Sequence, residues 1–317
     1  GTVERGHIYF FYRPKVQHEE AHDIDDVKNF HMLLVPRPPE FSAHTDNENL
    51  PHGDTDEQEL NLVQAGGDAV PAPELKDRTK KRFRLITVGK KRLPDPEIAG
   101  KKEVFWGSVV TFGDDLKALE EGLGENTYET KTRGTRHEEP ARIAGRGVYA
   151  IVNSEGSTPS KNATHLGYHL SHPADVGEVQ TALGIHKASS FVLQVKNPLA
   201  PPTGPQQIGL SKERRAEYPE GIMNEVFGRG TKGTQSYGLR FTTAHVSELL
   251  NHEGAELLLI ASHSGDQGND QALGEERGEA MREAGQKEGE ESTTDIFREL
   301  AFDKQTFPAE PLEGKWI

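Results

Sequence analysis

The chain has 317 residues, a formal net charge of -14 and a hydrophobic fraction of 33%. This acidic balance argues against bulk attraction to nucleic acid or to an anionic membrane surface. With no cysteine, the chain cannot form a disulfide framework, a cysteine-ligated zinc site or a thiol nucleophile. No apolar run approaches the ~18 residues of a membrane span, so we expect an intracellular protein, cytoplasmic or nuclear, with no membrane partner.

The first part of the chain alternates apolar strands with short helical patterns. A strand is predicted over 7–12 (HIYFFY), followed by a helix over 18–30, in which Ala21, Ile24 and Val27 lie about one turn apart. The next strand ends at Pro36, because proline cannot donate to a sheet ladder. Residues 40–80 are acidic and polar, which predicts a long surface insertion.

After this insertion, strands are predicted over 82–91 and 103–112. A helix follows over 113–123, with Asp114 or Asp115 as its cap. Another strand is predicted over 145–153. These elements give the first half of the chain a βαβ, insertion, βαβ order.

The second half shows a similar order. Strands are predicted over 164–170, 189–198, 237–243 and 255–261, with helices over 173–185 and 245–254. Residues 264–292 are charged and rich in glycine, which predicts a flexible loop or a weak exposed helix. A helix over 293–302, capped by Thr294, is expected to dock through Ile296, Phe297 and Leu300.

Two segments resemble each other across the halves: WGSVVTFGDDLKALEEG from Trp106 and YGLRFTTAHVSELLNHEG from Tyr237. We therefore predict an α+β fold of two pseudo-repeated βαβ-βαβ halves, ferredoxin-like or a related mixed sheet, with long acidic surface insertions. The alternative is one mixed sheet or partly closed barrel built from both halves. The predicted units are 1–153 with its insertion at about 40–80, 154–263, and 264–317, a flexible acidic segment with a docking helix and tail.

The strongest candidate site is the stretch KTRGTRHEEPARIAGRG at 131–147. Arginine binds carboxylate or phosphate bidentately, and glycine allows backbone N–H groups to approach an anion. The alternative is that these arginines pair with internal carboxylates, which we expect for the two nearest the following strand. The candidate ligand-binding residues are Lys131, Arg133, Arg136, Arg142 and Arg146, and the candidate catalytic residues are His137, Glu138 and Glu139.

Two other stretches are weaker candidates. The basic stretch 80–92 could face a phosphate-rich partner, although a solvated edge strand also carries lysine and arginine. His165 and His169 share a face of a predicted strand with His172 nearby, but packing or surface histidines explain this pattern better than a metal site. The chain carries no dinucleotide fingerprint, P-loop or nucleophile elbow, so we expect no cofactor and no metal.

Several runs resemble a known family. The chain is similar to an uncharacterised family found in fungi, with more distant relatives in plants. The runs that carry this resemblance are GHIYFFYRPKV, RLITVGKKRLPDP, TRGTRHEEPAR with GRGVYAIVN, and SSFVLQVKNP. Fungal members often carry the label "BTB domain transcription factor". A BTB domain is compact and largely helical, whereas this chain is rich in predicted strands. The resemblance implies an intracellular setting and carries no catalytic residues.

These observations favour a non-catalytic intracellular binding or interaction module whose arginine and glycine loop at 131–147 binds an anionic ligand or a protein partner. The alternative is an enzyme that acts on a phosphorylated or carboxylated small molecule. In that case His137 with Glu138 or Glu139 would act as an acid/base pair.

Overall fold

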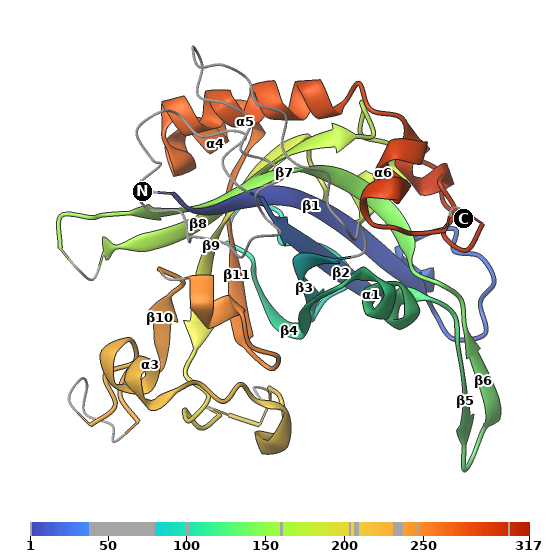
Figure 1. Cartoon of the computed structure of the whole chain (residues 1–317). Helices are drawn as coiled ribbons and strands as arrows, with labels where there is room; N and C mark the ends of the chain where they lie inside the picture. Colours follow the sequence, from blue (N-terminus) through green and yellow to red (C-terminus); the bar gives the residue numbers. More distant parts are fainter. Residues whose placement is uncertain are drawn as a thin grey trace.

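The protein is described by a computed structural model that covers residues 2–37, 80–98, 100, 102–158, 161–202, 204–205, 209–230, 237–245, 247–303 and 305–317. The predicted insertion at about 40–80 therefore lies almost wholly outside the described residues. Strands dominate the structure (Figure 1). The main sheet contains β1 (Thr2–Pro14), β2 (Val27–Pro36), β3 (Lys80–Val88), β4 (Val104–Asp115), β7 (Arg142–Ser154), β8 (Ala163–His172), β9 (Ala188–Lys196), β10 (Phe241–Thr243) and β11 (Glu256–Ser264).

The main sheet is antiparallel and closes on itself. Its strand order is β10-β9-β11-β4-β3-β2-β1-β7-β8, and β8 also pairs with β9. Eight strands, all except β10, therefore form a closed ring, which leaves none of them with an open edge. β10 extends β9 beyond the ring, with Phe241 opposite Lys196. We call these eight strands the ring.

Alternation along each strand divides apolar side chains between the inside and the outside of the ring. On β1, Ile8, Phe10 and Tyr12 belong to a buried cluster that takes residues from all eight strands, so this cluster fills the interior. Tyr9 and Phe11 point the other way and pack in a second cluster. Because both faces of β1 are buried, its sequence reads as a continuous apolar run.

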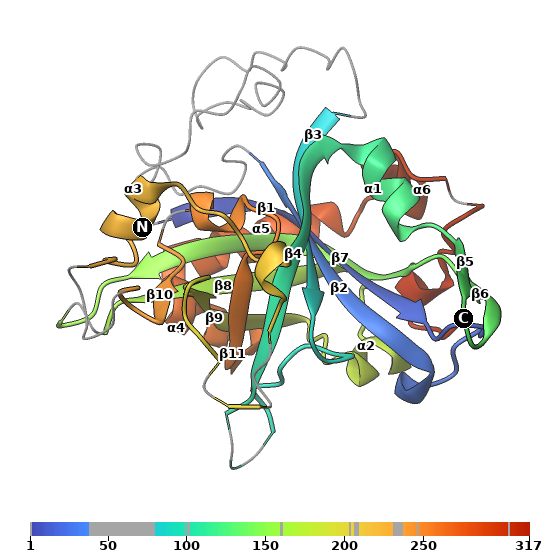
Figure 2. The same cartoon turned by 90° about the horizontal axis from the view of Figure 1, so that it is seen from below.

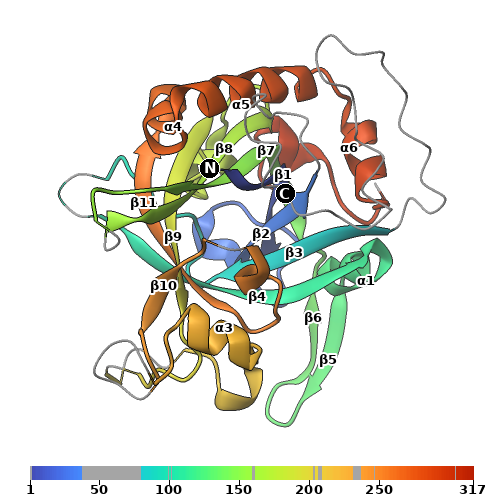
Figure 3. The same ribbon diagram turned by 60° about the vertical axis from the view of Figure 1, so that its left-hand side comes forward.

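Helices cover the outer face of the ring in two places. α1 (Leu116–Leu123) and α6 (Thr293–Glu299) both pack in the second cluster, against residues of β1, β2 and β3, and Figure 2 shows both at the same end of the sheet. α4 (Gly265–Leu273) packs on β8, β9 and β11, and α5 (Glu275–Glu288) lies across β7 and β8 (Figures 1 and 3). The short helices α2 (Glu178–Ala182) and α3 (Glu220–Glu225) add apolar side chains to the inner cluster.

A buried ion pair lies among the inward-facing residues of the ring. The guanidinium of Arg84 donates to Glu4, with an Nη2 to Oε2 distance of 2.6 Å, and its Nε donates to Asn251 at 2.8 Å. Tyr149 also donates to Glu4. Burial alone would lower the pKa of Arg84, but Glu4 outweighs it and the pKa is raised. Arg84 belongs to the predicted basic stretch 80–92, so one of its cations is internal.

The predicted α+β fold of two βαβ-βαβ halves is wrong, because the strands form one antiparallel sheet. The two similar segments are not equivalent: Trp106 lies in β4, which pairs with β3 and β11, whereas Tyr237 precedes β10, which pairs with β9. The predicted helix over 18–30 is also wrong. It contains a single 3-10 turn (Ile24–Asp26), and Val27 already opens β2 because Val27–Pro36 pairs with Gly6–Pro14 of β1. The alternative of one closing sheet with strands from both halves describes the ring better.

Several local predictions agree with the structure. α1 has Asp115 as its cap, with the carboxylate accepting from Lys117 N at 3.0 Å. α6 buries Ile296 and Phe297 as predicted, although its cap is Ser292 instead of Thr294. The segment 264–292, expected to be a loop or a weak exposed helix, forms α4 and α5 with buried inner faces. Within the described part of the chain, no helix is both long and apolar enough to cross a membrane.

Candidate functional site

A pocket of about 240 Å³ opens on the outer face of the ring, where β4, β9 and β11 meet β10. Figure 3 shows β10 beside β9, with α3 below them. The residues that line it come from parts of the chain that are far apart in sequence: Trp106, Gly107, Ser108, Lys196, Pro201, Pro202, Gly209, Leu210, Arg240, Phe241 and Glu256.

Strand alternation explains why charged residues face this pocket. Val195 and Leu257 point into the core, so their neighbours Lys196 and Glu256 must point outward. The register places Phe241 opposite Lys196. Pro201, Pro202, Gly209 and Leu210 line the pocket on this outward face. The charges are therefore buried although they lie outside the ring.

Lys196 and Glu256 form the polar centre of the pocket. Each is 6% exposed, and the distance from Lys196 Nζ to Glu256 Oε1 is 3.5 Å. Burial lowers the pKa of Lys196, and the nearby Glu256 carboxylate only partly opposes that shift. The second carboxylate oxygen of Glu256 accepts from Leu210 N at 3.3 Å. Gly209 has φ +59°, and a Cβ there would lie 2.5 Å from Glu256 Oε2, so this approach requires glycine.

Aromatic and cationic side chains form the outer wall. The rings of Trp106 and Phe241 are 6.0 Å apart. Arg240 lies over the ring of Tyr237, with its guanidinium carbon 5.8 Å from the ring centroid, and its Nη2 donates to Tyr237 Oη at 3.0 Å. Its other terminal nitrogen donates to the carbonyl of Pro201. These contacts fix the guanidinium at the pocket's edge.

The predicted stretch 131–147 does not form one site. Lys131 and Arg133 are exposed at the tip of a hairpin made by β5 (Asn126–Thr130) and β6 (Gly134–Glu138), and Arg136 is half-buried along it. The hairpin extends away from the ring (Figure 1). Its turn is held by Arg133 N, which donates to Thr130 Oγ1 at 2.9 Å.

The two later arginines are buried and bind other parts of the protein. Arg142 donates to the carbonyls of Pro140 at 2.7 Å and Glu19 at 2.9 Å. Arg146 is fully buried, and its guanidinium contacts three glutamates from α5, α6 and the segment between them: Glu288 at 3.4 Å, Glu291 at 3.2 Å and Glu299 at 2.6 Å. Burial alone would raise the pKa of Glu299, but His7, Arg146 and Arg37 lower it well below its usual range.

The candidate acid/base residues lie where the hairpin meets the ring. His137 Nε2 lies 3.1 Å from Glu139 Oε1, and its Nδ1 lies 3.0 Å from Thr127 Oγ1. Glu138 is buried and forms an ion pair with Lys28. His137 and Glu139 therefore form a hydrogen-bonded pair as proposed, but neither residue lines the pocket at β10.

His165, His169 and His172, which the sequence places close together, contact separate partners. His169 Nδ1 lies 2.9 Å from Asp266 Oδ1, and His172 Nε2 lies 2.8 Å from the carbonyl of Glu291. His165 lies beside Ser154 at 3.5 Å. Burial lowers the pKa of all three. They do not converge on a common point.

The pocket residues gave weak signals in the sequence. Lys196 ends an apolar strand just before Asn197 and Pro198, and a cation at that position is as typical of a strand end as of a site. Trp106 and Phe241 belong to the two segments that resemble each other in sequence. That resemblance led to the prediction of two repeated halves and did not indicate a pocket. Comparison with protein-family models, with curated proteins and with solved structures finds no match.

Proposed function

We propose that the protein binds a small organic anion with a flat apolar body in the pocket between β4, β9, β10 and β11. The observation that carries this proposal is the buried Lys196 beside aromatic walls. A buried ammonium must be compensated by acceptors. Among the described residues, Lys196 donates to the Glu256 carboxylate, over a long distance of 3.5 Å.

The balance of charge in the pocket favours an anion. Lys196 and Arg240 line it together with one carboxylate, that of Glu256, in a chain of net charge -14. Arg215 Nε also lies 3.9 Å from Glu256 Oε1, which further occupies that carboxylate. A ligand carboxylate placed beside Lys196 and Arg240 would gain charge-assisted hydrogen bonds in a partly dry site.

The apolar walls and the size favour a small planar molecule. Trp106, Phe241, Pro201 and Pro202 present flat surfaces, and aromatic rings prefer stacked or edge-on contact with such bodies. The volume of about 240 Å³ falls below the ~300–1,000 Å³ of pockets for drug-sized ligands. Together with the cysteine-free sequence, we infer a small-molecule binding module in an intracellular setting.

The two tryptophans make the proposal directly testable. Trp106 lines the pocket, whereas Trp316 packs against Tyr12 with ring centroids 5.2 Å apart. A Trp316→Phe protein therefore reports on the pocket alone. Benzoate should change its fluorescence saturably, and the neutral benzyl alcohol should bind at least tenfold more weakly.

Lys196→Met in the Trp316→Phe protein should weaken benzoate binding by tenfold or more. The matched control is Lys187→Met, because Lys187 is exposed near the opposite end of β9. Equal affinity for benzoate and benzyl alcohol, or unchanged benzoate binding in Lys196→Met, would refute the proposal.

The lowered pKa of Lys196 favours a second function, an enzyme that acts on a carboxylated small molecule. A neutral amine can condense with a keto acid to an imine with loss of water. Borohydride added with phenylpyruvate should then attach the reduced adduct to Lys196, as detected by peptide mass. Reversible binding without this adduct would leave the binding module as the function.

A further inference from the structure

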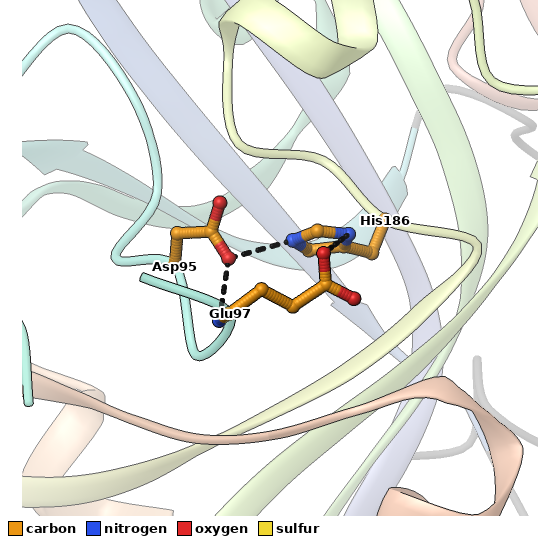
Figure 4. Close-up of side chains that lie close together, drawn as sticks. All are labelled: Asp95, Glu97 and His186. Carbon is orange, nitrogen blue, oxygen red and sulfur yellow. Dashed lines mark hydrogen bonds and ion pairs between the residues drawn. The ribbon is translucent and has the colours of Figure 1, made fainter. Parts of the chain in front are cut away.

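At the opposite ends of β9 and β11 from the pocket, three side chains with metal-binding atoms point toward one another (Figure 4). Asp95 and Glu97 come from the β3–β4 connection, and His186 comes from the turn before β9. His186 Nε2 lies 2.9 Å from Asp95 Oδ1, and His186 Nδ1 lies 3.9 Å from Glu97 Oε2. One ligand atom from each residue lies within 4.8 Å of the other two.

The two segments that carry these residues are fixed to each other by their backbones. Leu93 N donates to the carbonyl of Leu183 at 2.9 Å. Gly184 has φ +71°, and a Cβ there would lie 2.7 Å from the carbonyl oxygen of Leu93, so only glycine permits this approach. His186 N donates to the buried Tyr168 Oη at 3.0 Å. The three side chains therefore meet without any loop having to close.

A second set of contacts orients the carboxylates. The backbone N–H of Asp95 donates to Glu103 at 2.8 Å, and Arg92 binds both carboxylate oxygens of Glu103. Ser264 Oγ donates to Glu97 Oε1 at 3.0 Å, which leaves Oε2 directed toward His186. Such supporting hydrogen bonds are typical of residues that hold a metal.

The charge near these three residues is negative. Arg92 is occupied by Glu103, and the ammonium of Lys187 donates away from them, to the carbonyl of Ala174 at 2.9 Å. Two carboxylates therefore lie beside one imidazole, Asp95 next to its Nε2 and Glu97 next to its Nδ1, and either nitrogen can serve as the single ligand atom of His186. Ligands at 2.0–2.2 Å from one ion lie roughly 2.9–3.5 Å apart, and the Asp95–His186 contact of 2.9 Å already has this separation.

We propose that Asp95, Glu97 and His186 bind one divalent transition-metal ion, with water completing its coordination. A nitrogen ligand with two carboxylates suits zinc, manganese or cobalt better than magnesium or calcium, which prefer oxygen ligands. The side chains of Asp95 and His186 are 24% exposed and that of Glu97 is 61% exposed, so an ion can enter from solvent. The ion would join the β3–β4 connection to the turn before β9. The proposal does not depend on the function of the pocket.

The test is calorimetric titration of the whole protein with Zn²⁺ near pH 7.5, repeated with Co²⁺ while the visible spectrum is recorded. The wild type should bind one ion at a site that His186→Gln removes. Asp95→Asn and Glu97→Gln should each weaken it by tenfold or more. The cobalt bands should disappear in His186→Gln, and Zn²⁺ should raise the melting temperature of the wild type but not that of His186→Gln.

His22→Gln is the matched control, because His22 is an exposed histidine beside Glu20 on another part of the surface. It should bind Zn²⁺ as the wild type does. Glu97→Gln changes an exposed side chain and guards against a result caused by misfolding. Unchanged Zn²⁺ binding in His186→Gln and Glu97→Gln, or no stoichiometric binding by the wild type, would overturn the proposal.

Discussion

Arg133 and Arg146 belong to one basic stretch, yet the fold gives them opposite surroundings. Arg146 is fully buried against three glutamates, whereas Arg133 is exposed at the tip of the β5–β6 hairpin. Removing one partner of a buried ion pair leaves an uncompensated charge, which typically costs 3–5 kcal/mol. Arg146→Ala should therefore destabilise the protein by about 3–5 kcal/mol, and Arg133→Ala should change stability little, as surface substitutions usually do. Urea denaturation measures both.

Arg133→Ala and Arg136→Ala together test whether the hairpin binds an anion, as the sequence predicts. Phosphate should raise the melting temperature of the wild type in proportion to its occupancy of a site. Arg133→Ala and Arg136→Ala should each lose this increase while keeping the melting temperature of the phosphate-free wild type. An equal response to phosphate in all three proteins would assign phosphate binding elsewhere.

His31 makes the stability of the protein sensitive to acid. Burial, with a smaller contribution from Arg13, lowers its pKa from 6.5 to about 4, and its Nδ1 lies 2.9 Å from Thr87 Oγ1. Between these pKa values the unfolded chain binds a proton that the folded protein does not, so stability falls as the pH falls from 6.5 to 4 and is unaffected by this group above 6.5.

A His31→Gln protein should lose that part of the pH dependence, because glutamine can still contact Thr87 but cannot titrate. The wild type should lose about 3 kcal/mol more than His31→Gln between pH 7 and pH 4, as measured by urea denaturation at each pH. The exposed His22→Gln should follow the wild type. Parallel curves for the wild type and His31→Gln would show that His31 is not held neutral by the fold.

At the scale of elements, α5 packs through small residues. Gly278 and Gly285 are buried in α5, and a Cβ on Gly285 would lie 2.4 Å from His169 Cδ2 on β8. Met281, 2% exposed, is the large apolar residue that α5 places against Val148, Ala150 and Val152. Met281→Ala should therefore cost about 2–5 kcal/mol, whereas the exposed Glu279→Ala should cost little. Slow amide exchange over 275–288 would support this packing, and a small effect of Met281→Ala would contradict it.

The same packing explains which elements could be predicted. Buried strands such as β1, β9 and β11 are apolar runs, so their existence was clear from sequence. The buried face of α5 was not predicted, and the segment was expected to be a loop or a weak exposed helix, because glycines make part of its contact with the sheet and glycine adds nothing to an apolar periodicity. A helix was predicted over 18–30 because Ala21, Ile24 and Val27 are spaced as on one face of a helix. Pairing of β2 with β1 determines the structure of this segment instead. Long-range pairing of this kind leaves no local signal.

The candidate pocket could not be predicted for a related reason. Its charged pair joins Lys196 and Glu256, 60 residues apart, and its aromatic pair joins Trp106 and Phe241. Each pairing follows from strand register, which the sequence does not specify. The basic stretch 131–147 was conspicuous because its charges are close in sequence, but the fold places them at a hairpin tip, at the base of that hairpin and inside the protein.

At the scale of the whole molecule, the ring consists of two arcs. Residues 2–154 supply β4, β3, β2, β1 and β7, and residues 163–264 supply β8, β9 and β11. The arcs meet at two seams, β7 with β8 and β4 with β11. Each seam carries a ladder of backbone hydrogen bonds, and the inner core takes side chains from both arcs. Neither arc can enclose that core alone.

The last prediction follows from this division. The connection between β7 and β8 includes the exposed residues Ser157 and Thr158, so a protease site inserted between them should be cut in the native state. The cut protein should remain one particle by size exclusion and unfold in a single transition, because the seams and the shared core hold the arcs together. Expressed alone, either fragment should lack slow-exchanging amides, since it leaves sheet edges and apolar surface open to water. Two separate transitions, or a fragment that folds by itself, would mean that the arcs are independent domains.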